Sequence, residues 1–163
     1  MVTGFNGLSG FPGLSYITFE SPVSVGTGAG AGVKIYRAMT PDADGMPQVG
    51  QSARQLGVRP LDRLPHNDVG AAAAEDTVNP GEGMSVAPND PANLTKNRRP
   101  PQVNGGTGKD PVWELDTDDL GPTLEFVQGK PTHGVVGTKV PLPLAEYEQA
   151  LEAIRSNWVR VIG

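Results

Sequence analysis

Cysteine is absent from this chain of 163 residues, and its absence removes several kinds of structure and chemistry at once. No disulfide can close the fold, no thiolate can bind a metal ion, and no cysteine can act as a nucleophile. Packing alone must stabilise the chain, which suits a reducing cytoplasm and also many exported bacterial proteins. The two histidines show no metal-ligand spacing, so no metal site is expected.

Long apolar runs are also missing, as is positive charge near the start of the chain. No uninterrupted apolar run approaches the roughly 18–20 residues of a membrane-spanning helix, so no membrane partner is expected. No lysine or arginine precedes Lys34, which argues against a conventional secretory signal. The formal charge of −5 argues against generic nucleic-acid binding, although a local basic patch stays compatible with it.

Glycine and proline, in contrast, are abundant, with 22 and 16 residues. This composition approaches that of disordered chains, but two tryptophans, several Val/Ile/Leu runs and a modest net charge indicate a folded core. We therefore expect one small domain with long loops over residues 33–163. Residues 1–32 end in alternating glycine and alanine and carry a single charge, Glu20. They are interpreted as a separate glycine-rich segment, either a loosely packed leader with a short strand at 16–19 or a docking segment.

Hydrophobic periodicity divides residues 33–163 into short strands and one helix. Bounded or alternating apolar runs predict strands over 33–39, 81–88, 112–116, 124–127 and 132–140. The apolar positions that recur at helical spacing after Pro143 are Leu144, Tyr147, Leu151, Ile154, Trp158 and Val161. The expected fold class is α+β: a small mixed or antiparallel core of five to six short strands, with a C-terminal amphipathic helix on one face.

Residues 89–111 form a long predicted loop, which in a compact domain indicates either function or disorder. Its glycine-rich run ends in Gly108-Lys109 and invites comparison with a phosphate-binding loop. The Walker pattern fails, because Val103 and Asp110 occupy the positions that require glycine and Ser or Thr. The run is therefore a structural turn or a plain backbone-amide cradle for an anion.

The same loop carries a basic stretch, Lys96, Arg98, Arg99 and Lys109, with no acidic residue between its members. Such a stretch is either a solvated surface or a binding site for a pyrophosphate or an RNA backbone. Aromatic residues, which would favour RNA, do not interleave with these cations.

Arg37 and the two histidines are the other candidates for chemistry. Arg37 lies within the first predicted strand, on the face opposite Tyr36, where a buried arginine needs an anionic partner, either a carboxylate or a bound phosphate. His66 belongs to a polar stretch and is expected on the surface. His133 begins the last strand, as either a hydrogen-bonded structural residue or a side chain that projects into a cleft.

Three segments in this order resemble a known family. They are Tyr36–Ala38 in the first strand, Gly83–Val86 in the middle of the chain, and the tail from Thr132-His133 to Trp158. Together they resemble the ADP-ribosyltransferase-like toxins of the type VI secretion exported effector two family. In those toxins, as here, a Thr-His pair opens a strand that turns through proline into a terminal helix ending in tryptophan.

The resemblance implies an antibacterial toxin domain over residues 33–163 that uses NAD as its substrate and needs no metal. Arg37 would bind a phosphate or ribose of NAD, Ser85 would line the nicotinamide pocket, and His133 would lie near the reacting ribose. The implied catalytic residues are Arg37, Ser85 and His133, and the implied cofactor-binding residues are Tyr36, Arg37, Met84, Ser85 and Lys109. Such transferases generally supply a glutamate from a third strand. Here Glu146-Tyr147-Glu148 matches the Glu-x-Glu pattern of such transferases but lies inside a predicted helix. Glu125 is the alternative glutamate, on a predicted strand.

The resemblance also implies partners and a place of action. An immunity protein would cover the cleft, a secretion apparatus would export the toxin, and the toxin would act in the cytoplasm of the target cell. If the chain is not exported, a cytoplasmic location is expected. Under this reading, Arg37→Ala and His133→Ala should each relieve growth arrest and leave the fold intact.

Two other functions stay open. The first is a metal-free ribonuclease toxin that uses His133 with Lys109, Arg98 or Arg99 for acid–base cleavage at a ribose hydroxyl. The second is a non-enzymatic module of a secretion or phage assembly, docked on its partner through the N-terminal segment.

Overall fold

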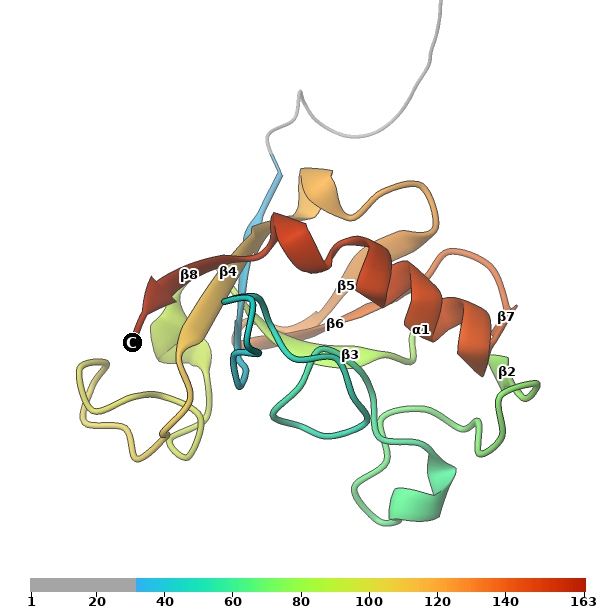
Figure 1. Cartoon of the computed structure of the whole chain (residues 1–163), viewed down its shortest axis with the longest axis horizontal. Coiled ribbons are helices and arrows are strands. Elements are labelled where there is room, and N and C mark those ends of the chain that lie inside the picture. Colours follow the sequence, from blue (N-terminus) through green and yellow to red (C-terminus); the bar gives the residue numbers. More distant parts are fainter. Residues whose placement is uncertain (1–31) are drawn as a thin grey trace, which may run out of the picture. The chain divides into compact units, whose positions relative to one another are not determined.

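The computed structural model describes residues 32–163. The predicted N-terminal segment, including the short strand expected at 16–19, lies outside the described residues except for Gly32. Figure 1 shows the described part as one twisted sheet with a helix across it.

An antiparallel sheet forms the centre of the domain, and its six strands run in the order β5-β6-β3-β1-β4-β8. The strands are β1 Lys34–Ala38, β3 Met84–Pro88, β4 Val112–Asp116, β5 Leu124–Lys130, β6 His133–Thr138 and β8 Val159–Ile162. A second sheet pairs β2, Thr77–Val78, with β7, Leu142–Pro143. The predicted α+β class is confirmed, and of the two sheet types considered the antiparallel one is present.

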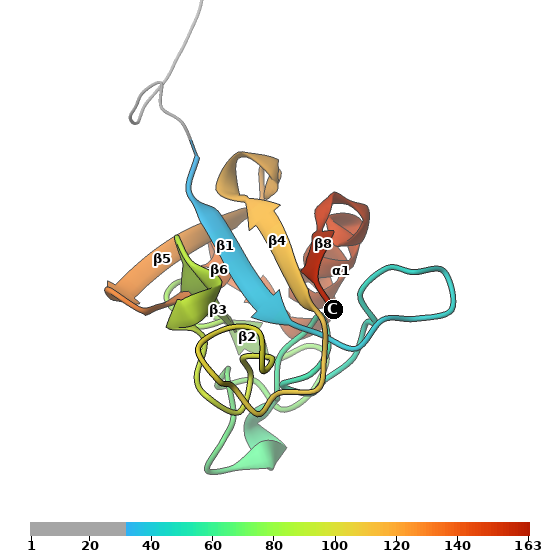
Figure 2. The same ribbon diagram turned by 90° about the vertical axis from the view of Figure 1, so that its left-hand side faces the viewer.

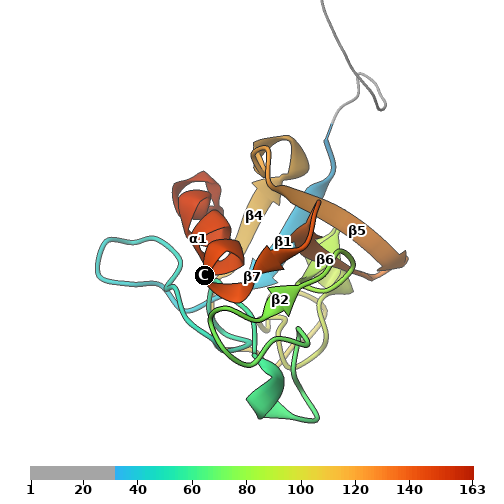
Figure 3. The same cartoon turned by 90° about the vertical axis from the view of Figure 1, so that its right-hand side faces the viewer.

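The helix α1, Leu144–Ala153, packs on one face of the six-stranded sheet. Its buried residues, Leu144, Tyr147 and Leu151, recur at the predicted helical spacing and join the main hydrophobic core. Figure 3 shows the small β2–β7 sheet beside the first turn of α1. The short β7 therefore leads the chain directly from the turn after β6 into the helix.

The buried hydroxyl of Tyr147 joins α1 to the middle of the sheet. It donates a hydrogen bond to the carbonyl of Val136 on β6 and accepts one from the backbone N–H of Met84 on β3, at 3.1 Å. Gly83 makes this approach possible, because a Cβ there would lie 2.2 Å from the Val136 carbonyl oxygen and 2.8 Å from the Tyr147 hydroxyl. No side chain larger than hydrogen fits at this junction.

The end of the predicted helix is wrong. The helix stops at Ala153 and a 3-10 turn, Arg155–Asn157, follows; the predicted helical residue Val161 lies instead in β8. β8 pairs with β4 at the sheet edge. The Val-Arg-Val-Ile sequence favours an extended chain, and the edge of β4 offers it backbone partners that a further helical turn would not use. Trp158 remains buried at the junction, as the apolar spacing predicted.

The loop of residues 89–111 covers the part of the sheet's second face that lies around β1. A smaller cluster there contains Tyr36, Ala87 and Val112, with Leu94 of the loop packed against it. Figure 2 looks onto β1 and β4, with this loop below them in yellow-green. Both faces of β1 are therefore covered, and the strand is buried after its first residue.

Candidate functional site

A cavity of about 290 Å³ lies where the start of β6, the middle of β3 and the end of β1 meet the loop of residues 89–111. Ser85 and His133 line it from β3 and β6, and Arg37 lines it from β1. Ser85 alternates with two residues of the core under α1, so its side chain belongs to the opposite face of the sheet. Val135 pairs with Ser85, and His133 lies two residues before Val135, so His133 shares that face.

The three residues with implied catalytic roles are thus brought together in one cavity. They lie far apart in the sequence, on three strands: Ser85 and His133 share one face of the sheet, whereas Arg37 alternates with Tyr36 and so belongs to the face under α1. His133 is exposed at the hairpin between β5 and β6, whereas Ser85 is partly buried and Arg37 is buried. All three residues line the cavity, and their catalytic roles stay predictions.

The other implied cofactor-binding residues do not line this cavity. The hydroxyl of Tyr36 donates to Glu114 Oε2 at 2.8 Å, and burial together with this carboxylate raises the pKa of Tyr36 to about 12. Met84 is fully buried in the core under α1. Lys109 is exposed on the loop. Binding of a ligand by these three side chains therefore gains no support from the cavity.

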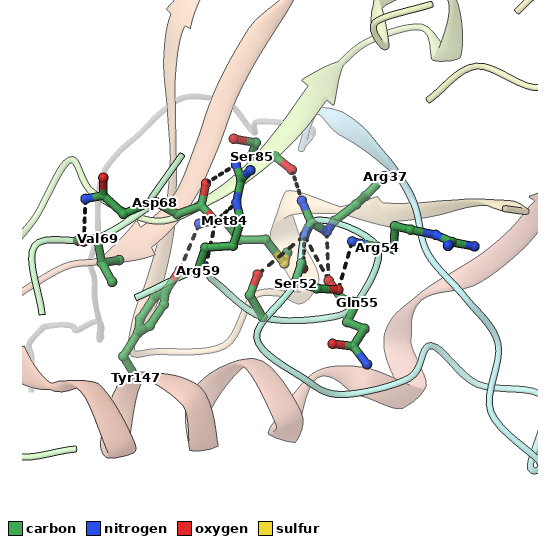
Figure 4. A network of polar contacts seen from close by, with 12 residues as sticks. Arg37, Ser52, Arg54, Gln55, Arg59, Asp68, Val69, Met84, Ser85 and Tyr147 are labelled. Carbon is green, nitrogen blue, oxygen red and sulfur yellow. Dashed lines mark hydrogen bonds and ion pairs between the residues drawn. The ribbon is translucent and has the colours of Figure 1, made fainter. Parts of the chain in front are cut away.

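Arg37 binds backbone carbonyl groups (Figure 4). Its Nη1 donates to the Ser85 carbonyl at 2.7 Å, and its Nη2 and Nε donate to the Gln55 carbonyl at 2.8 and 3.1 Å. Longer bonds from Nη2 reach the carbonyls of Ser52 and Gly57, at 3.3 and 3.4 Å. Of the two anionic partners expected for Arg37, a carboxylate is not found among the described residues, because carbonyl dipoles converge on the guanidinium instead, and a bound phosphate stays a prediction. Burial lowers the pKa of Arg37 to about 10, and the carboxylate of Asp68 opposes this shift.

Two further arginines near the cavity are paired with buried carboxylates. Arg59 binds Asp68 in bidentate fashion, with Nε–Oδ2 at 3.1 Å and Nη2–Oδ1 at 3.0 Å. Arg54 binds Asp110 in the same way, at 2.7 and 2.8 Å, and this hydrogen bond holds the pKa of the Asp110 carboxyl below its usual range. Both carboxylates are thus held by their own arginines.

Arg98 is the fourth arginine of this region, and it lines the cavity from the loop. The other charged lining residues are Arg37, Arg59 and Asp68, so cations outnumber carboxylates in the cavity of a chain that is acidic overall. The sequence placed Arg98 in a basic stretch, but Arg59 and Asp68 were not selected. Arg59 belongs to a cluster of arginines between residues 54 and 63 that has no clear period, and no sequence pattern selects Asp68.

The glutamates considered for a transferase lie elsewhere. Glu146 and Glu148 are on α1, as predicted, and Glu148 lines a second cavity of about 410 Å³ on another part of the molecule. Glu125 on β5 pairs with Gly137 and does not line the first cavity, which holds Ser85 and His133. Asp68 is the carboxylate of that cavity. Within the described residues, no group of three potential metal ligands occurs, and no helix is long and apolar enough to cross a membrane.

Comparison with known proteins adds no relative: no protein-family model matches the chain, and neither the curated proteins nor the solved structures give a match. The arrangement combines a basic cavity, a serine hydroxyl on a strand and a histidine at the rim. It is suited to binding a phosphate-bearing ligand and to proton transfer or hydrogen bonding at one end of that ligand.

Proposed function

We propose that this chain is an antibacterial toxin that cleaves NAD at the bond between nicotinamide and ribose, in a cavity like that of the ADP-ribosyltransferases. One observation carries the proposal: Arg37, Ser85 and His133, taken from the three segments that resemble the toxin family, line the same cavity. The excess of arginines in its lining adds to this, because NAD carries two negative phosphates.

Cleavage of the bond between nicotinamide and ribose requires the protein mainly to bind NAD and to orient it. When the bond between nicotinamide and ribose breaks, the bonding electrons leave with nicotinamide and positive charge develops on the ribose. A water molecule or an acceptor in the target cell then adds to the ribose carbon and releases a proton. Holding the two ends of NAD in place lowers the barrier for such a step.

Each cavity residue has a role in this proposal. His133, exposed at the rim, hydrogen-bonds the reacting ribose or takes the proton that is released. Ser85 offers a hydroxyl to the nicotinamide carboxamide. Arg37 positions Ser85, because it holds the carbonyl of this residue at 2.7 Å. NAD is the substrate, and no metal takes part.

The proposed biological setting follows from the same resemblance. The toxin is exported through a secretion apparatus and acts in the cytoplasm of the target cell. An immunity protein neutralises it by covering the mouth of the cavity at His133. A membrane and nucleic acid are not partners in this proposal.

The test is the consumption of NAD by the purified full-length chain, measured with the release of nicotinamide. We expect wild-type protein to convert NAD, and His133→Ala and Ser85→Ala to convert it far more slowly. His66→Ala is the matched control, because His66 is exposed on a loop that does not line the cavity. Equal NAD conversion by wild type and His133→Ala would show that the site is misassigned.

A second candidate function shares the cavity. Arg98 and His133 both line it, as a ribonuclease toxin would require, whereas Arg99 and Lys109 do not. The two functions separate on incubation with total RNA. The NAD proposal predicts intact RNA together with nicotinamide release, and the ribonuclease predicts degraded RNA with intact NAD. A non-enzymatic module predicts neither.

A further inference from the structure

The loop of residues 89–111 is held in one conformation by its own hydrogen bonds. Asp90 caps the short 3-10 helix Pro91–Asn93 by accepting from the Ala92 N–H at 2.8 Å, and the Asn93 amide donates to the Pro88 carbonyl at 2.8 Å. Further along, Thr107 N–H donates to the Lys96 carbonyl at 2.9 Å. A ligand that binds this loop therefore meets groups that are already ordered.

The glycine run of the loop packs against the backbone of Arg98 and Arg99. A Cβ at Gly106 would lie 2.0 Å from the Arg99 carbonyl oxygen, and a Cβ at Gly108 would lie 2.7 Å from the carbonyl of Arg98. The Gly108 N–H also donates to the Arg99 carbonyl at 2.7 Å. These glycines, which suggested a phosphate loop in the sequence, instead let one arm of the loop support the two arginines on the other.

The two adjacent arginines do different things. Arg99 braces the loop from within: its Nη1 donates to the Leu94 carbonyl at 2.9 Å and its Nε to the Val103 carbonyl at 3.3 Å. Arg98 lines the cavity, and within residues 32–163 its guanidinium makes no hydrogen bond or ion pair. One arginine is used by the fold, and its neighbour is presented to the cavity.

The charges around Arg98 favour the binding of an anion next to its guanidinium. Arg54 and Arg59 lie near enough to repel it, and each of them is already bound to its own carboxylate. Burial and these two cations lower the pKa of Arg98, with only Asp110 acting in the opposite direction. The family resemblance selects Arg37 for binding phosphate, but its guanidinium donates its hydrogen bonds to backbone carbonyls. A ligand with two adjacent negative charges relieves the repulsion around Arg98 most directly.

We propose that Arg98 binds the diphosphate of a nucleotide ligand in this cavity, with the neighbouring guanidinium of Arg59 adding to the positive field, and that Arg37 serves to build the wall. The identification of that nucleotide as NAD rests on the proposed function above, whereas the diphosphate site rests on the cavity alone.

The test is equilibrium binding of ADP and of adenosine to the full-length chain by calorimetry. We expect wild-type protein to bind ADP more tightly than adenosine. Arg98→Ala should weaken ADP binding roughly ten- to a hundredfold, the range for a charge-assisted hydrogen bond, and leave adenosine binding unchanged. Arg98→Lys should recover only part of the loss, because an ammonium lacks the fork of a guanidinium. Lys96→Ala is the matched control, since it removes an exposed cation of the same loop that does not line the cavity.

Three results would overturn the inference. The first is ADP binding no tighter than adenosine binding, and the second is ADP binding by both Arg98 variants that equals wild type. A phosphodiester ligand is the third outcome against it, seen if a short single-stranded RNA binds through Arg98 and ADP does not. Failure of the proposed function looks different. Arg98-dependent ADP binding without any NAD conversion contradicts the NAD-cleaving activity and leaves the diphosphate site in place.

Discussion

Replacing Arg37 by alanine should strongly destabilise the domain, rather than remove activity from a fold of unchanged stability. The family resemblance makes Arg37→Ala a simple loss of a ligand contact. In the structure the side chain is 6% exposed and its guanidinium holds carbonyl groups from β3 and from the turns at residues 52–57. Without it, the carbonyls of Ser85 and Gln55 lose the guanidinium donor at the point where the two segments meet.

The size of the effect follows from the number and length of the bonds. Two are short, at 2.7 and 2.8 Å to the carbonyls of Ser85 and Gln55, and the others are longer, at 3.1 to 3.4 Å. A buried group left without its partner costs about 1–3 kcal/mol, and the two short bonds dominate the sum. We therefore expect Arg37→Ala to lower the free energy of unfolding by about 2–6 kcal/mol, a large share of the roughly 5–15 kcal/mol typical of a domain.

Urea denaturation followed by tryptophan fluorescence is a suitable assay, because Trp113 and Trp158 are both buried. Arg37→Lys should recover part of the loss, since an ammonium keeps the charge but has fewer donors. Arg98→Ala is the control and should change the free energy of unfolding by less than about 0.5 kcal/mol. If Arg37→Ala costs no more than Arg98→Ala, the carbonyl cluster does not stabilise the fold and the reasoning fails.

Three further predictions concern the same framework. Tyr147→Phe removes the partner of two buried backbone groups and should lower the free energy of unfolding, measured by urea denaturation, by about 1–3 kcal/mol. Tyr36→Phe loses only a contact with a partly exposed carboxylate and should lower it less. Equal losses in the two variants would contradict this prediction. The folded-state pKa of Asp110 lies below its unfolded value of about 3.9, so its ionised form stabilises the fold above that pH and the benefit is lost as the pH falls through the folded pKa. Asp110→Asn should therefore be less stable than wild type at pH 7, and this deficit should shrink as the pH falls below the unfolded value; a deficit that does not change with pH would rule out the ion pair as its cause. Gly83→Ala should prevent folding or cost more than about 3 kcal/mol, while Gly129→Ala, with no atom within 4 Å of the new Cβ, should be tolerated in thermal denaturation; similar melting temperatures would refute the close contact.

The parts of the fold that depend on local pattern were predictable from the sequence. Alternating side chains located β1 and the strands that begin at Val112 and His133, and the spacing from Leu144 located α1. The end of the helix was not predictable in the same way. Val161 fits a helical period by spacing, and only the free edge of β4, formed far away in the sequence, makes an extended chain more favourable there.

The site shows the same division. The resemblance selected Arg37, Ser85 and His133, and these three line one cavity. What surrounds them depends on contacts that no local pattern records. Apart from that of Ser85 on β3, the carbonyls around Arg37 come from turns without a regular period. Arg59 is paired with Asp68, whereas Arg98 has no hydrogen bond or ion pair from its guanidinium among residues 32–163.

Conversion of NAD by the purified chain tests the central claim most directly. Nicotinamide should appear in step with the loss of NAD, at a rate that falls by about a hundredfold or more in His133→Ala, within the range for loss of an acid–base group, and that stays at the wild-type level in His66→Ala. Folded wild-type protein that leaves NAD intact would contradict the claim.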